Sequence, residues 1–287
     1  MIGLKEIEIQ LLEIAGDESL RCESNFAGRS DALDLIDLLI PALSGGSGNG
    51  DDRALIDVLH FAEELRSELE GIDAGWFGKL REGVLRGEDL KELMCGFGGG
   101  DGVGYDVLDH FVNGWMADGG LPEAELAPEP EMVFYQKTPV RIVLELERLA
   151  GLGVDDVFVD LGSGLGQVVL LMGLLTGARC VGVEFEPAYH NYAEGCRRRL
   201  GVGTVRFVNA DVRMTGFDEG TVFYLYTPFG GQMLEDVLGL LEREAQGRTI
   251  RIFTYGPCSP VVAGKGWLSC RSGDVGDIYR LCEFVSR

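Results

Sequence analysis

Three glycines in the stretch VFVDLGSGLGQVVLL (157–171) follow an apolar run that ends in an aspartate. The spacing is Asp-x-Gly-x-Gly-x-Gly, with Asp160, Gly162, Gly164 and Gly166. A nicotinamide or flavin site would place its third glycine at Gln167, and no Gly-Lys-Ser/Thr of a P-loop is present. Glycines allow the backbone to pass close to a ligand, and a carboxylate there would repel a pyrophosphate. The turn therefore predicts a ligand that carries an amine and no phosphate at this point.

The elements around this turn alternate between strand and helix from about residue 131 onwards. Helical patterns separate five strand-like runs, at 156–161, 179–184, 205–209, 221–226 and 248–254. Such alternation is typical of parallel pairing in a doubly wound α/β sheet, whose ligands bind beyond the carboxyl ends of the strands. Near the chain's end, two strand-like runs flank SGDVGD without room for a helix, which predicts a terminal antiparallel hairpin.

Two further carboxylates stand at the ends of strand-like runs. Glu184 ends the second strand-like run, 24 residues after Asp160, and Asp211 follows the third in FVNADV. With VDLGSGLGQVV, this set resembles the class I S-adenosylmethionine-dependent methyltransferases. The resemblance covers about residues 131–287 and implies a Rossmann-like seven-stranded sheet with S-adenosyl-L-methionine as cofactor. It also implies that Glu184 binds the ribose hydroxyls and that Asp211, with a neighbouring backbone amide, contacts the adenine amine.

The sequence of the glycine turn is similar in particular to that of the non-SET histone lysine methyltransferases of the disruptor-of-telomeric-silencing type and of small prokaryotic relatives. The segment VFYQKTPVRIVLELERLAGL is similar to one that folds over the methionine end of the cofactor in those enzymes. The resemblance thus implies this cofactor-binding set: Tyr135, Gln136, Thr138, Asp160, Gly162, Ser163, Gly164, Gly166, Gln167, Glu184, Asn209, Ala210, Asp211 and Tyr226.

Two departures bear on the substrate. The fourth strand ends in Tyr-Leu-Tyr-Thr-Pro-Phe (224–229), whereas amine methylases of nucleic acids have Asn/Asp-Pro-Pro-aromatic there. Thr227 lacks the amide acceptor that would bind a base amine, and the telomeric-silencing enzymes also have asparagine in this region. The chain has no lysine-rich segment of the kind that holds nucleosomal DNA. Both features count against a nucleosomal or nucleic-acid substrate.

Aromatic residues near the fourth strand are the candidates for the catalytic channel. Methyl transfer is an in-line displacement, so the protein must align the nucleophile and remove any proton it carries. Aromatic faces favour a cationic methyl group, and a desolvated channel lowers the pKa of an amine. We expect Tyr226, Tyr224 and Phe229 to line this channel, with a tyrosine hydroxyl orienting the nucleophile. Core packing is the alternative for each ring, and no residue is indicated as a general base.

The first part of the chain differs from the rest in its secondary-structure pattern and in its charge. Residues 1–130 hold 28 acidic and 9 basic residues, a net of −19, whereas residues 131–287 have a net of −3. Residues 1–120 show helical patterns between glycine-rich stretches at 45–50 and 96–104, and Asp51 or Asp52 is a candidate helix cap. LPEAELAPEPE (121–131) is typical of an extended linker. The sequence predicts an acidic helical domain at 1–120, a linker at 121–131 and a methyltransferase domain at 132–287.

The composition of the chain limits the classes of partner that we expect it to bind. An acidic surface disfavours nucleic acid and attracts a basic partner, although it can also serve solubility alone. No apolar run is long enough for a membrane span, and seven scattered cysteines without a CxxC pair favour a reduced, cytoplasmic protein. The three histidines show no metal-ligand spacing, so we expect no metal site. The sequence indicates no oligomeric state.

The leading hypothesis is a methyltransferase that acts on a small molecule or on a protein lysine. A second enzyme hypothesis is O- or C-methylation of a small molecule, with the helical domain as a lid. The non-catalytic alternative is an adenosine-ligand-binding or scaffold protein whose acidic domain recruits a basic partner.

Overall fold

The computed structural model describes residues 3–44, 52–94, 97, 104–117 and 120–287. The chain divides into two compact units. The helical unit comprises Met1–Glu88, Cys95–Gly100 and Asp106–Trp115, and the sheet unit comprises Asp89–Met94, Asp101–Tyr105 and Met116–Arg287. The division into domains at 1–120, 121–131 and 132–287 stays a prediction.

The helical unit is held together by apolar stripes on its long helices. Its elements are α1 (Leu4–Gly16), η1 (Glu18–Arg21), α2 (Phe26–Ser44), α3 (Asp52–Leu85) and most of α5 (Val107–Met116). Helical spacing brings the apolar side chains of α1, α2 and α3 into one core, which includes Leu11, Ile36 and Leu65. Arg29 is fully buried, and its Nε donates to Asp73 Oδ1 at 2.6 Å, so the one buried cation of this core is paired in the part of the chain that the structure describes.

Two helix boundaries differ from the sequence patterns. The patterns predict separate helices over 52–72 and 76–94, but α3 is one helix to Leu85, followed by the short α4 (Leu90–Met94). The reason is that buried positions continue through the glycines, with Leu65, Leu69, Phe77 and Leu80 on one stripe. The candidate cap residues and the glycine-rich stretches at 45–50 and 98–103 lie outside the described residues or side chains.

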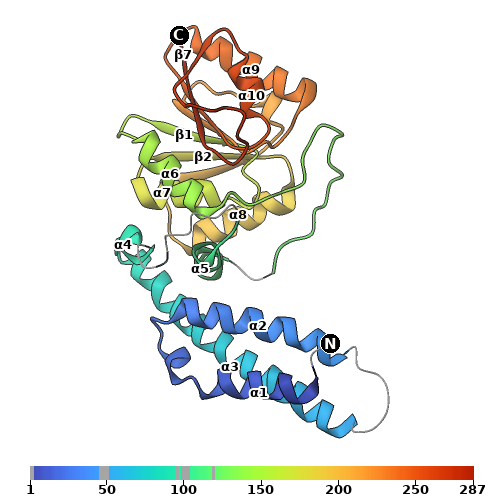
Figure 1. The fold of residues 1–287 in the computed structure, drawn as a ribbon. Coiled ribbons are helices and arrows are strands. Elements are labelled where there is room, and N and C mark those ends of the chain that lie inside the picture. The colour runs from blue at the N-terminus through green and yellow to red at the C-terminus, as the bar shows by residue number, and fades with distance from the viewer. Residues whose placement is uncertain (1–2, 45–51, 95–96, 98–103, 118–119) are drawn as a thin grey trace. The chain divides into compact units, whose positions relative to one another are not determined.

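The sheet unit is a seven-stranded sheet in the order β3-β2-β1-β4-β5-β7-β6 (Figure 1). The first five strands pair in parallel, and β7 is antiparallel to both neighbours. The strands are β1 (Val157–Leu161), β2 (Arg179–Glu184), β3 (Val205–Asn209), β4 (Val222–Leu225), β5 (Arg251–Thr254), β6 (Leu268–Cys270) and β7 (Cys282–Ser286). The predicted Rossmann-like methyltransferase sheet with a terminal antiparallel hairpin is therefore confirmed.

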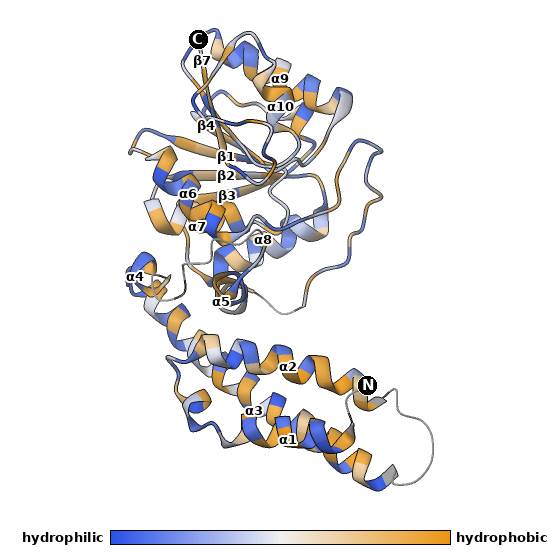
Figure 2. Ribbon diagram, in the orientation of Figure 1, coloured by the Kyte–Doolittle hydropathy of each residue, from blue (hydrophilic) through white to orange (hydrophobic). Residues whose placement is uncertain are grey.

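Helices cover both faces of this sheet, as Figure 1 shows. On one face lie α6 (Val140–Ala150), α7 (Gln167–Thr176) and α8 (Pro187–Arg199). On the other lie α9 (Gly231–Ala245) and α10 (Ser259–Ala263), with the 3₁₀ turn η2 (Val212–Met214) beside α9. Figure 2 shows the strands as mostly hydrophobic and α6 and α9 as striped, which is the pattern of elements buried on two sides and on one side.

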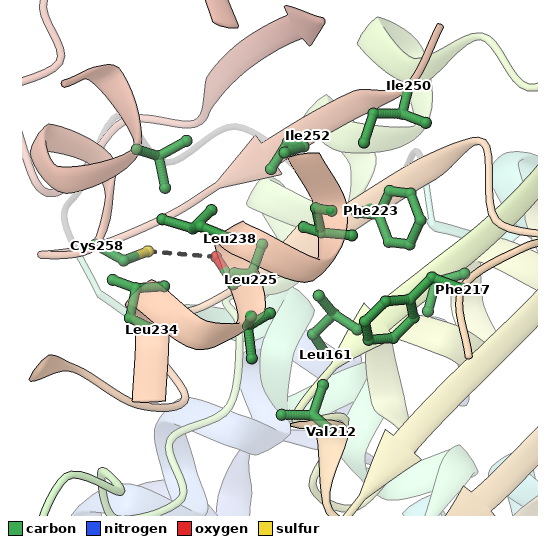
Figure 3. Packing of buried hydrophobic residues seen from close by; sticks show 14 of the residues in the cluster. Leu161, Val212, Phe217, Phe223, Leu225, Leu234, Leu238, Ile250, Ile252 and Cys258 are labelled. Carbon is green, nitrogen blue, oxygen red and sulfur yellow. Dashed lines mark hydrogen bonds between the residues drawn. The ribbon is translucent and has the colours of Figure 1, made fainter. Parts of the chain in front are cut away.

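The core under α9 fixes the strands that carry the site. Leu161, Phe223, Leu225 and Ile252 from three neighbouring strands pack against Leu234 and its neighbours on α9 (Figure 3). The Cys258 Sγ donates to the carbonyl oxygen of Leu225 at 3.8 Å in the same cluster. Because adjacent parallel strands end at the same edge, this core brings the loops after β1, β2, β4 and β5 together.

Candidate functional site

A cavity of about 650 Å³ opens at the carboxyl ends of the parallel strands. Residues at the ends of β1 to β5 or in the loops after them line it, together with residues between 124 and 138 and two residues of the β6–β7 loop. Its position is that of the ligand crevice in doubly wound sheets.

The glycine turn after β1 is closely covered by other side chains. A Cβ on Gly162 would lie 2.4 Å from Pro228 Cβ, and a Cβ on Gly164 would lie 2.2 Å from the Tyr135 ring. Both glycines also have positive φ, at 91° and 52°. Glycine is therefore required here by backbone conformation and by space, and both glycines line the cavity.

Two buried carboxylates flank the turn. Glu184 Oε2 accepts from the Gly164 N–H at 2.7 Å, and its Oε1 accepts from the Glu186 N–H at 2.8 Å. These bonds hold the carboxylate at the cavity edge, with lone pairs left for other donors. Asp160 is 3% exposed, and burial followed by the charge of Glu184 raises its pKa to about 8. Burial likewise raises the pKa of Glu184, opposed by the two backbone bonds. The pair lacks a cation among the described residues around it, so the site favours a ligand that brings one.

The carboxylate after β3 already has a partner. Asp211 Oδ2 accepts from Arg213 Nη2 at 2.6 Å, and Arg213 Nη2 also donates to Glu129 Oε1 at 2.7 Å. These contacts with Arg213 lower the pKa of Asp211. Asp211 and Ala210 line the cavity, but a contact from Asp211 to an adenine amine would share the carboxylate with Arg213. Sequence spacing alone gave no sign of this competition.

A long segment without helix or strand crosses beside the cavity, and we call residues 121–136 the strap. Glu186 accepts from the N–H groups of Glu125 and Leu126 at 2.8 and 2.9 Å. Further along, Met132 forms a β-bridge with Phe229. The Glu131 carboxylate accepts from two N–H groups in the first turn of α9, at 3.0 and 2.7 Å. The expected linker at 121–131 is thus fastened to the sheet unit along its length.

The residues just after the strap tie it to the sheet. Thr138 Oγ1 and the Tyr224 hydroxyl lie 3.1 Å apart, and Gln167 Nε2 donates to the Thr138 carbonyl at 3.3 Å. The Tyr226 hydroxyl donates to Gln136 Oε1 at 3.4 Å. Residues 136–138, the first residue of α7 and the end of β4 are therefore joined by hydrogen bonds at the cavity.

The structure brings most of the expected site residues to the cavity wall. The expected residues that line it are Tyr135, Gln136, Thr138, Asp160, Gly162, Ser163, Gly164, Gln167, Glu184, Ala210, Asp211, Tyr224, Tyr226 and Phe229. The hydroxyl of Ser163 has no hydrogen-bond partner among the described residues and lies against Gly182, where a Cβ would be 2.7 Å from it. Lining does not test a binding role, so the roles stay predictions.

Two expected residues do not line the cavity. Gly166 packs inside the sheet unit, where its missing Cβ leaves room for Phe207 and Ala193. The Asn209 amide donates to the carbonyl oxygens of Glu184 and Phe185 at 2.9 and 3.0 Å, which fixes the end of β2. In this structure, both residues therefore help to fix the shape of the site.

The three aromatic candidates for catalysis differ in their surroundings. Tyr224 is 1% exposed and Phe229 is 4% exposed, so each ring is largely a core residue whose edge lines the cavity. Tyr226 is half-buried, and its ring lies 4.8 Å from that of Tyr255, centroid to centroid. Of the three, Tyr226 has the position best suited to meet a second ligand.

The lining residues that sequence reasoning missed include Glu186, Tyr255, Ile278 and Tyr279. Glu186 precedes a proline at the start of α8. This pattern predicts a helix cap, but it does not predict a ligand contact. Tyr255 follows β5 at the same edge as Tyr226, and that signal was available in the sequence. Tyr279 reaches the cavity from the β6–β7 loop, which only the tertiary structure places there.

The arrangement fits S-adenosylmethionine by the chemistry of its donor set. Glu184 offers carboxylate oxygens for two hydroxyl groups, Asp160 offers a charge for an ammonium group, and the glycine turn offers close backbone approach. Apolar side chains of the strap and Val212 offer walls for a flat ring.

Removing the Arg213 side chain should loosen the strap. We expect Arg213→Gln to raise about fivefold the fraction of molecules in which the strap is detached from the sheet unit. The reason is that about 1 kcal/mol of part-exposed ion pairing with Glu129 and Asp211 is lost. Limited proteolysis would then cut residues 121–136 faster, and saturating S-adenosylhomocysteine should slow the cut. Arg206→Gln, which loses only a 3.7 Å surface pair with Glu219, is the control. Equal cleavage rates in both variants, or no protection by ligand, would argue against a closing strap.

Comparison with known proteins gives one family match. The model of the family described as histone methylation protein DOT1 matches residues 133–205, about a quarter of the chain. The matched range contains the upstream segment and the glycine turn, and it supports a class I S-adenosylmethionine-dependent methyltransferase. A comparison with curated proteins finds no match.

Solved structures with a similar fold are methyltransferases. An RNA methyltransferase from Salinibacter ruber in complex with S-adenosyl-L-homocysteine is 22% identical, with a TM-score of 0.43 over 53% of this chain and 92% of that chain. A human methyltransferase 10 domain containing protein is 14% identical, with a TM-score of 0.40 over 52% and 83%. Geranyl diphosphate C-methyltransferase from Streptomyces coelicolor A3(2) is 20% identical, with a TM-score of 0.33 over 40% and 43%.

No group of three or more His, Cys, Asp or Glu side chains within the described ranges is arranged to hold a metal ion. None of the helices in those ranges is both long and apolar enough to cross a membrane.

Proposed function

We propose that the protein binds S-adenosylmethionine in this cavity and catalyses methyl transfer to a small molecule or to a protein lysine. The observation that carries the proposal is Glu184, held at the cavity edge by the N–H groups of Gly164 and Glu186 and facing the same space as Asp160. When bound, the cofactor supplies a methyl group activated by a positively charged sulfur.

The residues have separate tasks in this proposal. Glu184 binds the ribose hydroxyls, and Asp160 pairs with the ammonium group. Tyr135, whose ring covers Gly164, and the strap exclude water from the cofactor. Tyr226 and its partner Tyr255 border the space left for the acceptor, where their faces favour a cationic methyl group.

The ribose assignment has a direct test. We expect Glu184→Gln to weaken binding of S-adenosylhomocysteine by about 1–1.5 kcal/mol, because a neutral amide replaces charge-assisted hydrogen bonds. Isothermal titration calorimetry measures this, with Glu219→Gln on the surface as control. Unchanged affinity in Glu184→Gln would show that the ribose lies elsewhere, and tight NAD binding without S-adenosylmethionine binding would overturn the proposal as a whole.

Label transfer separates the acceptor classes. Incubation of the protein with methyl-labelled S-adenosylmethionine and a cell lysate would place label in small molecules, in protein, or in neither. Label in neither favours the non-catalytic alternative, an adenosine-ligand-binding protein whose acidic residues attract a basic partner. A transfer rate to protein that falls with salt would support a basic protein acceptor, because the charge over residues 1–130 is −19.

A further inference from the structure

The mouth of the cavity is bordered by exposed apolar side chains that have no assigned role. Val133 and Phe134 come from the strap, and Ile278 and Tyr279 come from the β6–β7 loop. All four line the cavity and are exposed, Phe134 by 83% and Tyr279 by 52%. We call these four side chains the collar. Exposed apolar side chains that gather at a cavity mark a surface that a ligand covers.

Hydrogen bonds place the strap side of the collar beside the loop after β4. The Val133 N–H donates to the Pro228 carbonyl at 3.1 Å, and the Tyr226 hydroxyl donates to Gln136 Oε1 at 3.4 Å. Phe134 lies in the chain between these two fastened positions. It therefore stands on the acceptor's side of the cavity, whereas the ribose and adenine assignments lie at the ends of β2 and β3.

Sheet pairing places the other side of the collar at the end of β5. β7 begins at Cys282, which pairs with Thr254, the last residue of β5. Ile278 and Tyr279 come just before β7, so the antiparallel pairing brings them to the edge where Tyr255 leaves β5. The two sides of the collar thus lie at the ends of neighbouring strands, β4 and β5.

The charges of the lining disfavour an anionic acceptor. Four carboxylates line the cavity, and no Lys, Arg or His is among the described lining residues. These carboxylates lie at the ends of β1, β2 and β3 or just after them, and the collar itself carries no charge: they are Asp160, Glu184, Glu186 and Asp211. An apolar ring gains free energy by leaving water for the collar, whereas a charged group would lose its hydration there. The collar therefore favours an uncharged ligand.

The size of the cavity places the acceptor at the collar. A cavity of about 650 Å³ has room for one drug-sized ligand, and S-adenosylmethionine is of that size. With the cofactor bound, an acceptor therefore meets the mouth, where the rings of Phe134 and Tyr279 are exposed. Two aromatic rings on different segments suit a flat ligand, because rings stabilise one another in stacked or edge-to-face contact. A lysine side chain is a single narrow stem with a charged end, so it would bury less of either ring.

We propose that the collar binds the methyl acceptor and that this acceptor is a small molecule with an uncharged aromatic ring. Phe134 and Tyr279 contact the ring, and Tyr226 and Tyr255 border the reacting atom. The nucleophilic atom of the acceptor forms a bond to the methyl carbon as the carbon–sulfur bond breaks. S-adenosylhomocysteine leaves, and any proton on the nucleophile passes to water. This inference rests on the proposed function and narrows its substrate to an aromatic small molecule instead of a protein lysine.

The test measures the binding of three probes to the full chain saturated with S-adenosylhomocysteine. 2-Naphthol is an uncharged aromatic molecule, and 2-naphthoate has the same ring system with a negative charge. n-Butylamine is a cationic mimic of a lysine side chain without a ring. We expect calorimetry at pH 7.5 to show 2-naphthol binding about tenfold or more tightly than either of the others. A smaller difference, or no binding of 2-naphthol, would overturn the proposal.

Truncation of the collar rings should weaken the binding of 2-naphthol. We expect Phe134→Ala and Tyr279→Ala each to weaken it about fivefold, because apolar contact area is lost. Both side chains are more than half exposed, so each variant should keep the thermal midpoint of the wild type. Met214→Ala is the matched control, because Met214 is 84% exposed and is not among the lining residues. Unchanged 2-naphthol binding in either collar variant would contradict the assignment.

Two other occupants of the collar would give different results. The adenine of the cofactor is also a flat ring, so S-adenosylhomocysteine binding is measured in wild type and in both collar variants. Weaker S-adenosylhomocysteine binding in either variant would assign that side chain to the cofactor and overturn the proposal. A heat of dilution of the protein alone that disappears in Phe134→Ala would assign the collar to contact between two copies, and it would overturn the proposal as well.

Failure of this inference is distinguishable from failure of the proposed function. A wild-type protein that does not bind S-adenosylhomocysteine would refute the proposed function. Binding of S-adenosylhomocysteine without binding of 2-naphthol would refute the collar assignment alone. The comparison of three probes on wild type needs no variant, so it decides even if a variant fails to fold.

Discussion

Replacing Gly166 with alanine should destabilise the sheet unit by about 2–5 kcal/mol. Two costs add at this position. The φ of 80° lies in the left-handed region, which costs an L-residue about 1–2 kcal/mol. The new Cβ would also lie 2.6 Å from Phe207 Cζ and 2.7 Å from Ala193 Cβ, and overpacking of this kind costs about 1–3 kcal/mol.

The chain contains a matched control for this prediction. Gly177 has a similar φ of 67°, but a Cβ there meets no atom within 4 Å. Gly177→Ala should therefore show only the backbone cost of about 1–2 kcal/mol. Urea denaturation followed by circular dichroism compares the two variants. Equal midpoints would mean that α8 and Phe207 shift easily and that Gly166 is not a packing constraint.

This comparison also separates two kinds of glycine in one motif. Gly166 is closed in by Phe207 and Ala193, whereas Gly162 and Gly164 lie under Pro228 and Tyr135 at the cavity. The resemblance treated all three as ligand contacts. Sequence spacing reports that a residue without a side chain is needed, but only the packing shows whether a ligand or the protein occupies the space.

The sheet was predictable because its signals are local. Each parallel strand is a short buried run, and the glycine turn after β1 stands directly between a strand and a helix. The long α3 was not predictable in the same way, because intrinsic propensity disfavours its glycines and tertiary packing of Phe77 and Leu80 outweighs that cost.

The contacts of the strap and the place of Tyr279 could not be predicted from local sequence patterns. The proline-rich segment was expected to be an extended linker, and its partners Glu186 and Arg213 follow the residues they contact by 60 and 84 positions in sequence. Tyr279 likewise reaches the cavity only through the antiparallel hairpin. Contacts between distant residues depend on the completed sheet, so the positions of the strap and of Tyr279 were not accessible from the sequence.

The affinity for S-adenosylhomocysteine should rise about fiftyfold from pH 5.5 to pH 7.5, because Asp160 must lose a proton to pair with the ligand's ammonium group. The free protein holds that proton, since burial and Glu184 raise the pKa of Asp160 to about 8. The carboxylate fraction therefore falls about tenfold for each pH unit below 8, and affinity falls with it. Above pH 8 the rise should end, because Asp160 is then largely ionised and further deprotonation adds little.

Calorimetry at pH 7 in buffers of different ionisation enthalpy should detect the release of close to one proton on binding. Asp160→Asn removes the titrating group, so its proton release should vanish and its affinity below pH 7 should lose most of its pH dependence. The matched ligand is 5′-methylthioadenosine, which has no ammonium group and leaves Asp160 protonated, so its affinity should change little over the same range. An equal pH slope for the two ligands would place the ammonium group away from Asp160. It would also remove the reason that an acidic residue, instead of a neutral one, stands in β1 just before the glycine turn.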